Sequence, residues 1–297
     1  MHRTAYLLLL LTAIAWGANA VAGKLAVGHI SPMLLTTVRW ALAAAIMAVI
    51  GAGNLKREWG QVRPHLIYLS VLGAVGFTFF NAFMYSALTF TSAINVSIEQ
   101  AGLPMVIFVV NFLLFALRPS GLQVLGFLLS LAGVALTASH GEVMRLAALD
   151  VNFGDALMMI ALLLYGGYTV ALRYKPVISW QSTMLVLTAS AFVVSLPFAA
   201  WEIATDRAVW PDATGWAIGA FTAIFPSVLA QAFYIRGVEL IGSNRAGLFI
   251  NLVPIFGTLL AILFVGEQFH LYHAAAMVLV LGGIWLAEHS GRKMAAT

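Results

Sequence analysis

Residues 4–23 read TAYLLLLLTAIAWGANAVAG, a run of twenty residues without a charged side chain. A helix needs about 20 mostly apolar residues to cross the hydrocarbon core of a bilayer. A secretory signal peptide has a similar composition, and Ala18-Asn19-Ala20 resembles its cleavage site. We expect a retained transmembrane span, because the apolar run continues to Gly23 and because a related segment recurs later in the chain.

Further apolar runs of similar length follow the first one. They lie near 33–51, 66–90, 93–116, 121–139, 153–173, 180–201, 213–235, 243–265 and 270–288. The runs are continuously apolar and do not alternate with polar residues, which favours helices over the strands of a membrane β-barrel. The sequence therefore predicts an all-α integral membrane protein with ten transmembrane helices.

The composition agrees with a membrane location. Of 297 residues, 62% are hydrophobic and only 9% are charged, whereas a soluble domain carries roughly 25% charged residues. The lipid bilayer is therefore the expected surroundings. The formal net charge is +4, but Lys and Arg are scattered singly or in pairs, so no nucleic-acid partner is expected. The chain has no cysteine, which excludes disulfides and thiolate chemistry.

The distribution of basic residues predicts the orientation, because cytoplasmic loops carry an excess of Lys and Arg. With the N-terminus inside, the cytoplasmic segments hold Arg3, Lys56, Arg57, Arg63, Arg118, Arg173, Lys175, Arg236, Arg245, Arg292 and Lys293. The outer segments hold Lys24, Arg145 and Arg207. We expect a multi-pass protein of the cytoplasmic (inner) membrane with both termini in the cytoplasm.

The two halves of the chain resemble each other when one is shifted by 150 residues. The shift places Pro104 on Pro254, Gly17 on Gly167 and Gly133 on Gly283, and the spans coincide without a gap. We expect one repeat over 4–139 (spans 1–5) and a second over 153–288 (spans 6–10). Five spans per repeat make the second repeat enter the membrane upside down, an arrangement that recurs in secondary transporters. It predicts a central cavity and alternating access; a duplication without a transport role is the alternative.

Several short motifs resemble a known family. They are Trp16-Gly17 followed by Lys24, Pro32 and Arg39; residues 87–93 (ALTFTSA) with Pro104 after them; and Gly266-Glu267. Over essentially the whole chain they resemble the drug/metabolite transporter superfamily, specifically its EamA-type exporters, and most of all the YddG-type (aromatic) amino acid exporters. The resemblance implies a ten-helix basket and efflux of amino acids, metabolites or drugs. The family often ends span 4 with Gly-Glu, whereas this chain has residues 116–119 (ALRP) there.

Polar residues inside a span are costly and tend to face a cavity or another helix. Spans 3 and 8 carry such residues at helical spacing, namely Thr78, Asn81, Tyr85, Ser227, Gln231 and Tyr234. The 150-residue shift places Asn81 on Gln231. Two carboxamides offer donors and acceptors to the carboxylate and ammonium groups of a substrate. Hydrogen bonding between helices is the alternative use of these residues.

Span 4 adds Asn95, Glu99 and Gln100 to the expected cavity residues. Glu99 is the carboxylate that lies deepest within a span, and Arg39 lies at a similar depth, so an Arg39–Glu99 ion pair is geometrically feasible. Three interpretations remain open for Glu99: a structural ion pair, a site for a substrate ammonium, and a proton-coupling carboxylate.

Tyr165 and Asn251 complete the expected cavity wall. Trp16, Asn19 and Tyr168 come from counterpart spans, and ordinary packing is the alternative for them. Pro104 and Pro254 lie within their spans, where proline frees a backbone carbonyl and can kink a helix. We predict that these two prolines are hinges, with a static kink as the alternative.

No sequence feature indicates catalysis, so we do not expect an enzyme. His270 and His273 lack a third ligand nearby, which argues against a metal site. No phosphate-binding loop occurs, so no nucleotide or other cofactor is expected. We expect an exporter of amino acids, including aromatic ones, and related small metabolites. The alternatives are efflux of lipophilic drugs and a membrane scaffold or receptor that does not transport.

Overall fold

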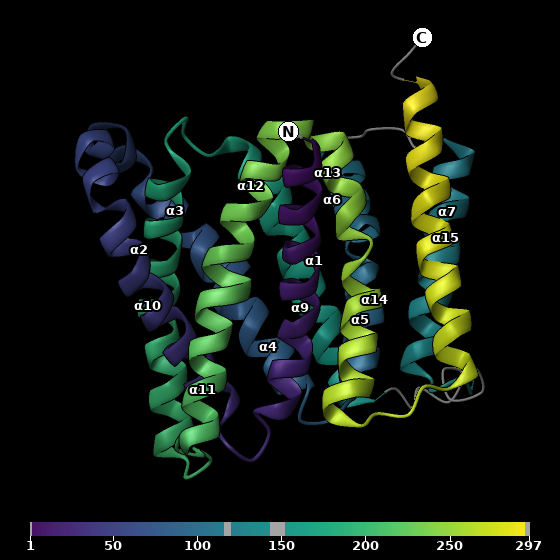
Figure 1. Ribbon diagram of the computed structural model, residues 1–297, viewed down its shortest axis with the longest axis horizontal. Helices are drawn as coiled ribbons and strands as arrows, with labels where there is room; N and C mark the ends of the chain where they lie inside the picture. The colour runs from purple at the N-terminus through teal and green to yellow at the C-terminus, as the bar shows by residue number, and fades with distance from the viewer. Residues whose placement is uncertain (1, 116–119, 143–151, 295–297) are drawn as a thin grey trace.

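The computed structural model describes residues 2–115, 120–142 and 152–294. All regular structure in these ranges is helical, and the helices stand side by side in one bundle (Figure 1). Arg118 and Arg145, two residues behind the predicted orientation, lie outside the described ranges, and so does the ALRP stretch.

The first half of the chain forms helices that follow the predicted spans. They are α1 (His2–Leu25), α2 (Pro32–Val62), η1 (Arg63–His65), α3 (Leu66–Gly73), η2 (Ala74–Phe79), α4 (Phe80–Ala87), α5 (Ala93–Ala101), α6 (Leu103–Phe115) and α7 (Gly121–Ala138). The segments α3, η2 and α4 follow one another without a break. Ser92 begins α5 by accepting a hydrogen bond from the Asn95 backbone, and Ser120 caps α7 in the same way.

The second half is helical as well. It contains α9 (Phe153–Ala171), η3 (Leu172–Tyr174), α10 (Trp180–Ala204), α11 (Ala213–Thr222), η4 (Ala223–Leu229), α12 (Ala230–Ile241), α13 (Ser243–Ile250), α14 (Val253–Leu260), η5 (Ala261–Val265) and α15 (Leu271–Met294). The described parts of both halves thus confirm the predicted all-helical class.

Membrane-spanning capacity is clear for most of these helices. Within the described ranges, 6 helices are long and apolar enough to cross a membrane, and α5 with α6 makes a seventh if this pair, bent by 40°, counts as one span. Residues 253–265 and 271–287 form shorter apolar helices. A multi-pass helical membrane protein is therefore confirmed, while the arrangement of ten spans in two inverted repeats stays a prediction.

The second helix is longer than the predicted span. Residues 33–51 were expected to cross the membrane and 54–58 to lie in a loop, but α2 continues to Val62. No proline interrupts the chain before Pro64, and the charged side chains of Lys56 and Arg57 are exposed at this end. At 1.5 Å per residue the helix is about 46 Å long. Because the hydrocarbon core is about 30 Å thick, the last turns extend beyond it.

The most extensive helix pairs are α2 with α10 and α7 with α15. In the second pair two glycines allow the backbones to approach closely. A Cβ atom built on Gly126 would lie 2.4 Å from the carbonyl oxygen of Gly283, and one on Gly283 would lie 2.4 Å from the oxygen of Gly126. Small residues at helix crossings are the usual device for close packing within membranes.

Equivalent helices of the two halves make equivalent contacts. α1 packs against α12 and α14, while α9 packs against α4 and α6. α1 runs from the upper to the lower end of the bundle in Figure 1. Near the start of α9, Gly154 lies against the carbonyl of Ala87 at the lower end, and near its end Ala171 accepts a hydrogen bond from Tyr68. Helices α1 and α9 therefore run in opposite directions.

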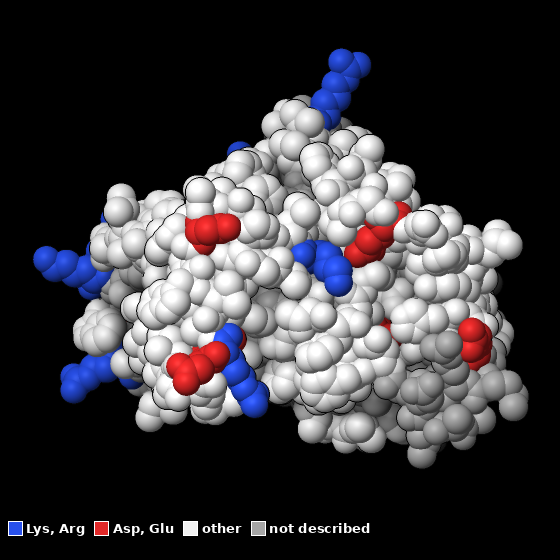
Figure 2. All heavy atoms as spheres, turned by 90° about the horizontal axis from the view of Figure 1, so that it is seen from below, with Lys and Arg blue, Asp and Glu red and all other residues white. Residues whose placement is uncertain are grey.

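The outer surface is apolar. Large side chains such as Val49, Ile67 and Leu271 are 83–90% exposed, which suits contact with hydrocarbon rather than water. Figure 2 views the molecule from the lower end and shows a few acidic and basic side chains, some of them side by side, on a largely uncharged surface.

Candidate functional site

A cavity of about 400 Å³ lies among helices of both halves, a size within the range of roughly 300–1,000 Å³ that small-molecule sites occupy. Arg39 follows the start of α2 by seven residues and so lies about 10 Å from the lower end. Thr169 follows the start of α9 by sixteen residues and lies about 24 Å from that end. Both residues line the cavity, which therefore occupies the middle of the bundle.

The cavity wall combines amide, hydroxyl and aromatic side chains with one cationic group. The polar lining residues are Asn19, Arg39, Asn81, Gln100, Thr169, Ser227, Gln231 and Asn251. The aromatic ones are Trp16, Trp40, Phe77, Phe80, Tyr165, Tyr168 and Tyr234. A largely apolar wall with a few convergent polar groups is typical of a ligand site.

Arg39 is held by a network of neutral side chains. Its Nη1 donates to Oδ1 of Asn19 and to Oδ1 of Asn81, each at 2.8 Å, and it also donates to the Tyr85 hydroxyl. Its Nε donates to Oγ of Ser227 at 2.9 Å. Within the described ranges Nη2 makes no hydrogen bond, so this end of the guanidinium is available to a ligand in the cavity.

The expected Arg39–Glu99 ion pair is wrong. The Arg39 guanidinium contacts neutral groups, and neither carboxyl oxygen of Glu99 has a hydrogen-bond partner among the described residues. Equal depth along two helices does not make two side chains meet, because each also has a direction around its helix axis. In the part of the chain that the structure describes, no Asp or Glu pairs with Arg39.

The structure brings most of the expected cavity residues together. Asn81, Gln100, Tyr165, Ser227, Gln231, Tyr234 and Asn251 all line the cavity. They come from α4, α5, α9, η4 and α12, with Asn251 at the break between α13 and α14. The side chains of Gln231 and Asn251 make no hydrogen bond to any described residue, which leaves their amide groups for a ligand.

Four expected residues do not line this cavity. Thr78 donates to the carbonyl of Ala191 in α10. It lies in η2, whose wider turn changes the side-chain direction relative to the regular helix that the spacing assumed. Tyr85 contacts Arg39 from the lower side. Asn95 and Glu99 are buried on a different face of α5.

Several residues of the wall are not among the predicted cavity residues. The sequence places Arg39 in a family-like motif and in a possible ion pair with Glu99, but not among the cavity residues, although a lone cation inside an apolar run is itself a signal of a functional site. The ring of Trp40 stacks on Phe77 with centroids 4.6 Å apart, and Cζ of Arg39 lies 4.8 Å from the Trp40 ring. No motif marks Trp40 or Phe80, because aromatic residues are common in spans.

Each predicted hinge proline follows a break in a span. α5 and α6 meet at Gly102 with a bend of 40°, and Pro104 is the second residue of α6. α13 and α14 are separated by Asn251 and Leu252, and Pro254 is the second residue of α14. Both prolines line the cavity. Motion at these breaks stays a prediction.

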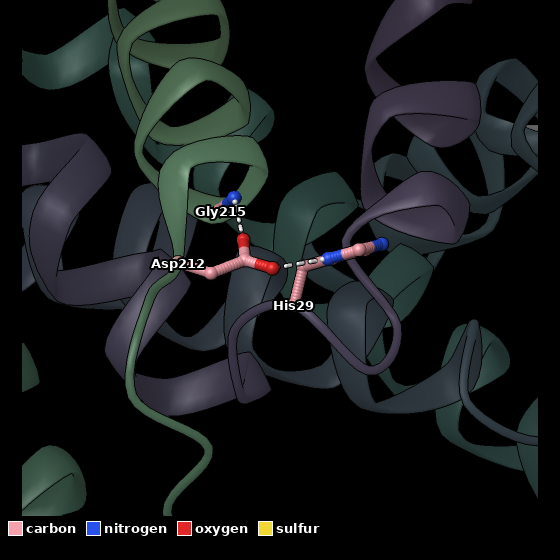
Figure 3. Close-up of polar contacts among 3 residues, drawn as sticks. All are labelled: His29, Asp212 and Gly215. Atoms are coloured by element: carbon pink, nitrogen blue, oxygen red, sulfur yellow. Dashed lines mark hydrogen bonds and ion pairs between the residues drawn. The ribbon is translucent and has the colours of Figure 1, made fainter.

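An exposed contact between His29 and Asp212, which we call the latch, joins the two halves at the lower end (Figure 3). Nδ1 of His29 lies 2.7 Å from Oδ2 of Asp212, and Oδ1 of Asp212 accepts from the Gly215 backbone at 2.8 Å. The hydrogen bond from His29 is the main reason that the pKa of Asp212 falls below its ordinary value. A second pocket, of about 210 Å³, lies between this latch and Tyr85, which separates it from Arg39.

Two reciprocal caps join α2 to α10. At the lower end the Glu202 carboxylate accepts hydrogen bonds from Oγ of Ser31 and from the Leu34 backbone. At the opposite ends of α2 and α10, the Glu58 carboxylate accepts hydrogen bonds from the backbone N–H and the hydroxyl of Ser179. In each case a glutamate late in one helix satisfies the free N–H groups at the start of the other.

Comparison with known proteins gives a consistent result. The model of the EamA-like transporter family matches residues 3–139 and 152–288. Uncharacterized transporter YyaM of Bacillus subtilis is 28% identical over 97% of this chain and 94% of its own length. An uncharacterized transporter of Archaeoglobus fulgidus is 27% identical over 96% and 98%. One crystal structure, of a protein 21% identical to this chain, matches with a TM-score of 0.62 over 97% and 98% of the two chains, which supports the fold.

Proposed function

Because the chain belongs to the EamA-like transporter family, and so moves a small molecule across a bilayer, we propose that it exports amino acids, aromatic ones included, and related small metabolites. The YddG-type exporters, which its motifs resemble, have this substrate class. The substrate binds in the central cavity, and the two halves form inverted repeats over 4–139 and 153–288.

The observation that carries this proposal is the position of Arg39. Among the described residues the Arg39 guanidinium has no acidic partner, and the other residues that line the cavity are uncharged. Such a guanidinium is suited to a substrate carboxylate, which it can bind through charge-assisted hydrogen bonds. The free Nη2 group supplies the contact. The amide oxygens of Gln231 and Asn251 are acceptors for the substrate ammonium group, and the aromatic wall offers apolar area to its side chain.

The cavity disfavours one of the alternatives. A lipophilic cation would be repelled by Arg39, so cationic drugs are poor candidates, although the aromatic wall also suits neutral lipophilic compounds. A scaffold that binds no small molecule would have no need for a polar cavity between the two halves.

Three observations support alternating access between inverted repeats. Helices α1 and α9 run in opposite directions, their contacts are equivalent, and the reciprocal caps of α2 and α10 lie at opposite ends. In this arrangement the upper end, where Lys56, Arg57 and Arg173 lie, faces the cytoplasm of a cell with the protein in its inner membrane. The His29–Asp212 latch then closes the outer side, and export requires it to open.

A flux assay tests the proposal. The purified chain in liposomes loaded with unlabelled L-phenylalanine should take up labelled L-phenylalanine by exchange, and the rate should saturate. A panel of zwitterionic amino acids, lipophilic cations and neutral lipophilic compounds identifies the class. Absence of exchange for every amino acid, with intact exchange of another class, would contradict the assignment.

A further inference from the structure

Two carboxyl groups outside the cavity have no counter-charge. Glu99 is in the last turn of α5 and Asp155 is in the first turn of α9, and both side chains are completely buried. None of their four oxygens has a hydrogen-bond partner in the described residues. The two helices pack together, and the two carboxyl groups interact electrostatically.

An arrangement of this kind requires positive charge at the pair. A buried carboxylate without a partner is very costly, and two carboxylates that share one site cannot both be ionised at low cost. A single proton lessens both costs, because it neutralises one carboxyl group and removes the repulsion between two carboxylates. Among the described residues there is no group of three or more His, Asp and Glu that could hold a metal ion.

The surroundings do not supply a fixed cation. The titratable side chains on neighbouring elements are Lys24 on α1, His140 after α7, Glu267 after η5, His270 before α15, and Tyr272 and His273 on α15. Of these, His140 and Tyr272 interact electrostatically with Asp155. The described parts of α6, α7, α14 and η5 contribute none.

The nearest of these groups already have other partners. The Lys24 ammonium donates to the carbonyls of Leu88 and Thr91. The Glu267 carboxylate accepts from the backbone at the start of α5. Nε2 of His273 lies 3.2 Å from Oδ1 of Asn95, whose side chain lies beside Asp155.

We propose that Glu99 and Asp155 together form a proton-binding site that couples export to proton entry, so that the protein works as a proton antiporter. This inference rests on the proposed function. One proton enters from the lower end, binds to a carboxyl oxygen of the pair, and leaves toward the upper end after the substrate has been released outside. His140, which is partly exposed at the lower end and interacts electrostatically with Asp155, lies on the route of entry.

The position of Glu99 links the proton to the substrate. The next two residues, Gln100 and Ala101, line the cavity, and the 40° break at Gly102 follows. Loss of the proton leaves both carboxyl groups ionised, and the charge on Glu99 then needs water or a new partner. That need favours a movement of α5 about the break, and the movement changes the cavity wall.

Two transport assays separate this inference from the proposed function. Exchange of labelled L-phenylalanine at equal pH tests substrate transport alone, and accumulation driven by a pH gradient tests coupling. We expect wild-type protein to show both. Glu99→Gln and Asp155→Asn should retain exchange and lose accumulation. The control Glu239→Gln removes an exposed carboxylate that pairs with Arg236 and should retain both.

Each outcome decides one of the two ideas. Robust wild-type exchange that is indifferent to the pH gradient, or accumulation driven by a sodium gradient at equal pH, would overturn the proton site and leave the proposed function intact. If no amino acid exchanges, the proposed function fails. In that case infrared spectra still test the proton site, since a buried carboxylic-acid band should be present in wild-type protein and absent in the Glu99→Gln/Asp155→Asn double variant.

Discussion

Nη1 of Arg39 donates a hydrogen bond to Oδ1 of Asn81 over 2.8 Å, which ties α2 to α4 at the lower side of the cavity. The amide Nδ2 of Asn81 in turn donates to the carbonyl of Phe77 at 2.7 Å. Asn81 is therefore oriented by its own helix, and it holds the guanidinium in a fixed position.

Replacing Arg39 should abolish recognition of a carboxylate. A charge-assisted hydrogen bond contributes about 1.5–3 kcal/mol, so Arg39→Gln should lower the apparent affinity for L-phenylalanine by roughly 10- to 100-fold. Arg39→Lys keeps the charge but loses the planar fork and should have an intermediate effect. The measurement is saturation of exchange in liposomes for the amino acid and for its decarboxylated amine. If Arg39→Gln still prefers the amino acid to the amine as strongly as wild type does, the guanidinium does not bind the substrate carboxylate.

Asn81 and Gln231 should differ although the 150-residue shift relates them. Gln231 makes no hydrogen bond within the described residues, so Gln231→Ala should weaken transport by roughly fivefold, the equivalent of one hydrogen bond, without lowering thermal stability. Asn81→Ala should weaken transport and also lower stability, because Arg39 loses a buried partner. Gln61→Ala, at an exposed position, is the control. Equal stability losses in the two cavity variants would contradict this division of roles.

Adjacent glycines in α15 provide a matched test of the α7–α15 contact. A Cβ on Gly283 would meet the Gly126 oxygen at 2.4 Å, whereas one on Gly282 meets nothing within 4 Å. Overpacking costs roughly 1–3 kcal/mol, so Gly283→Ala should unfold in detergent at a lower temperature than wild type. Gly282→Ala should be as stable or slightly more stable. Indistinguishable melting temperatures would refute the close approach.

Weakening the contact between His29 and Asp212 should make the second pocket more accessible from the lower end. In Asp212→Asn the bond to His29 weakens, so a cysteine at the buried position Leu35, which lines the second pocket, should be labelled by maleimide about two- to fivefold faster, the scale expected of an exposed ion pair. Asp206→Asn, in the same loop, is the control. A labelling rate that Asp212→Asn leaves unchanged would argue against a gate here.

The same latch has a defined pH dependence. Since the folded protein holds the pKa of Asp212 below its ordinary value of 3.8, the stabilisation by this group is complete above that value. It is lost as the pH falls through the lowered pKa. Maleimide needs the thiolate, so this series uses a dithiodipyridine, which still reacts with thiols in acid. The Leu35→Cys protein should become easier to label with it only in strongly acidic buffer, and the difference from Asp212→Asn should vanish there. Acceleration already near neutral pH would assign the opening to another group.

Single cysteines test the inverted repeats, because the natural chain contains none. Lys56→Cys and Thr205→Cys occupy nearly equivalent positions of the two halves, and both are exposed. An impermeant maleimide applied to intact cells should label Thr205→Cys only, and inverted vesicles should reverse the pattern. Labelling of both from the same side would end the proposal of inverted repeats.

The helical class and the approximate span limits could be predicted from the sequence. An apolar run long enough to cross the bilayer is stable in lipid and not in water. The end of α2 could not be predicted, since charged residues such as Lys56 are compatible with helix once the chain has left the hydrocarbon core. The prediction that Thr78 faces the cavity was wrong, because the wide turn of η2 changes the direction of this side chain.

The sequence by itself determined that this chain lies in a membrane, that it is helical, and that its halves are related, because hydrophobicity and spacing are local properties. Only the tertiary structure decided which polar groups meet. Arg39 donates hydrogen bonds to Asn19, Asn81 and Ser227 and does not pair with Glu99. Glu99 lies on α5, which packs against the helix that carries Asp155. Such pairings depend on the rotation of each helix about its axis and on its breaks, which are set by packing against distant segments.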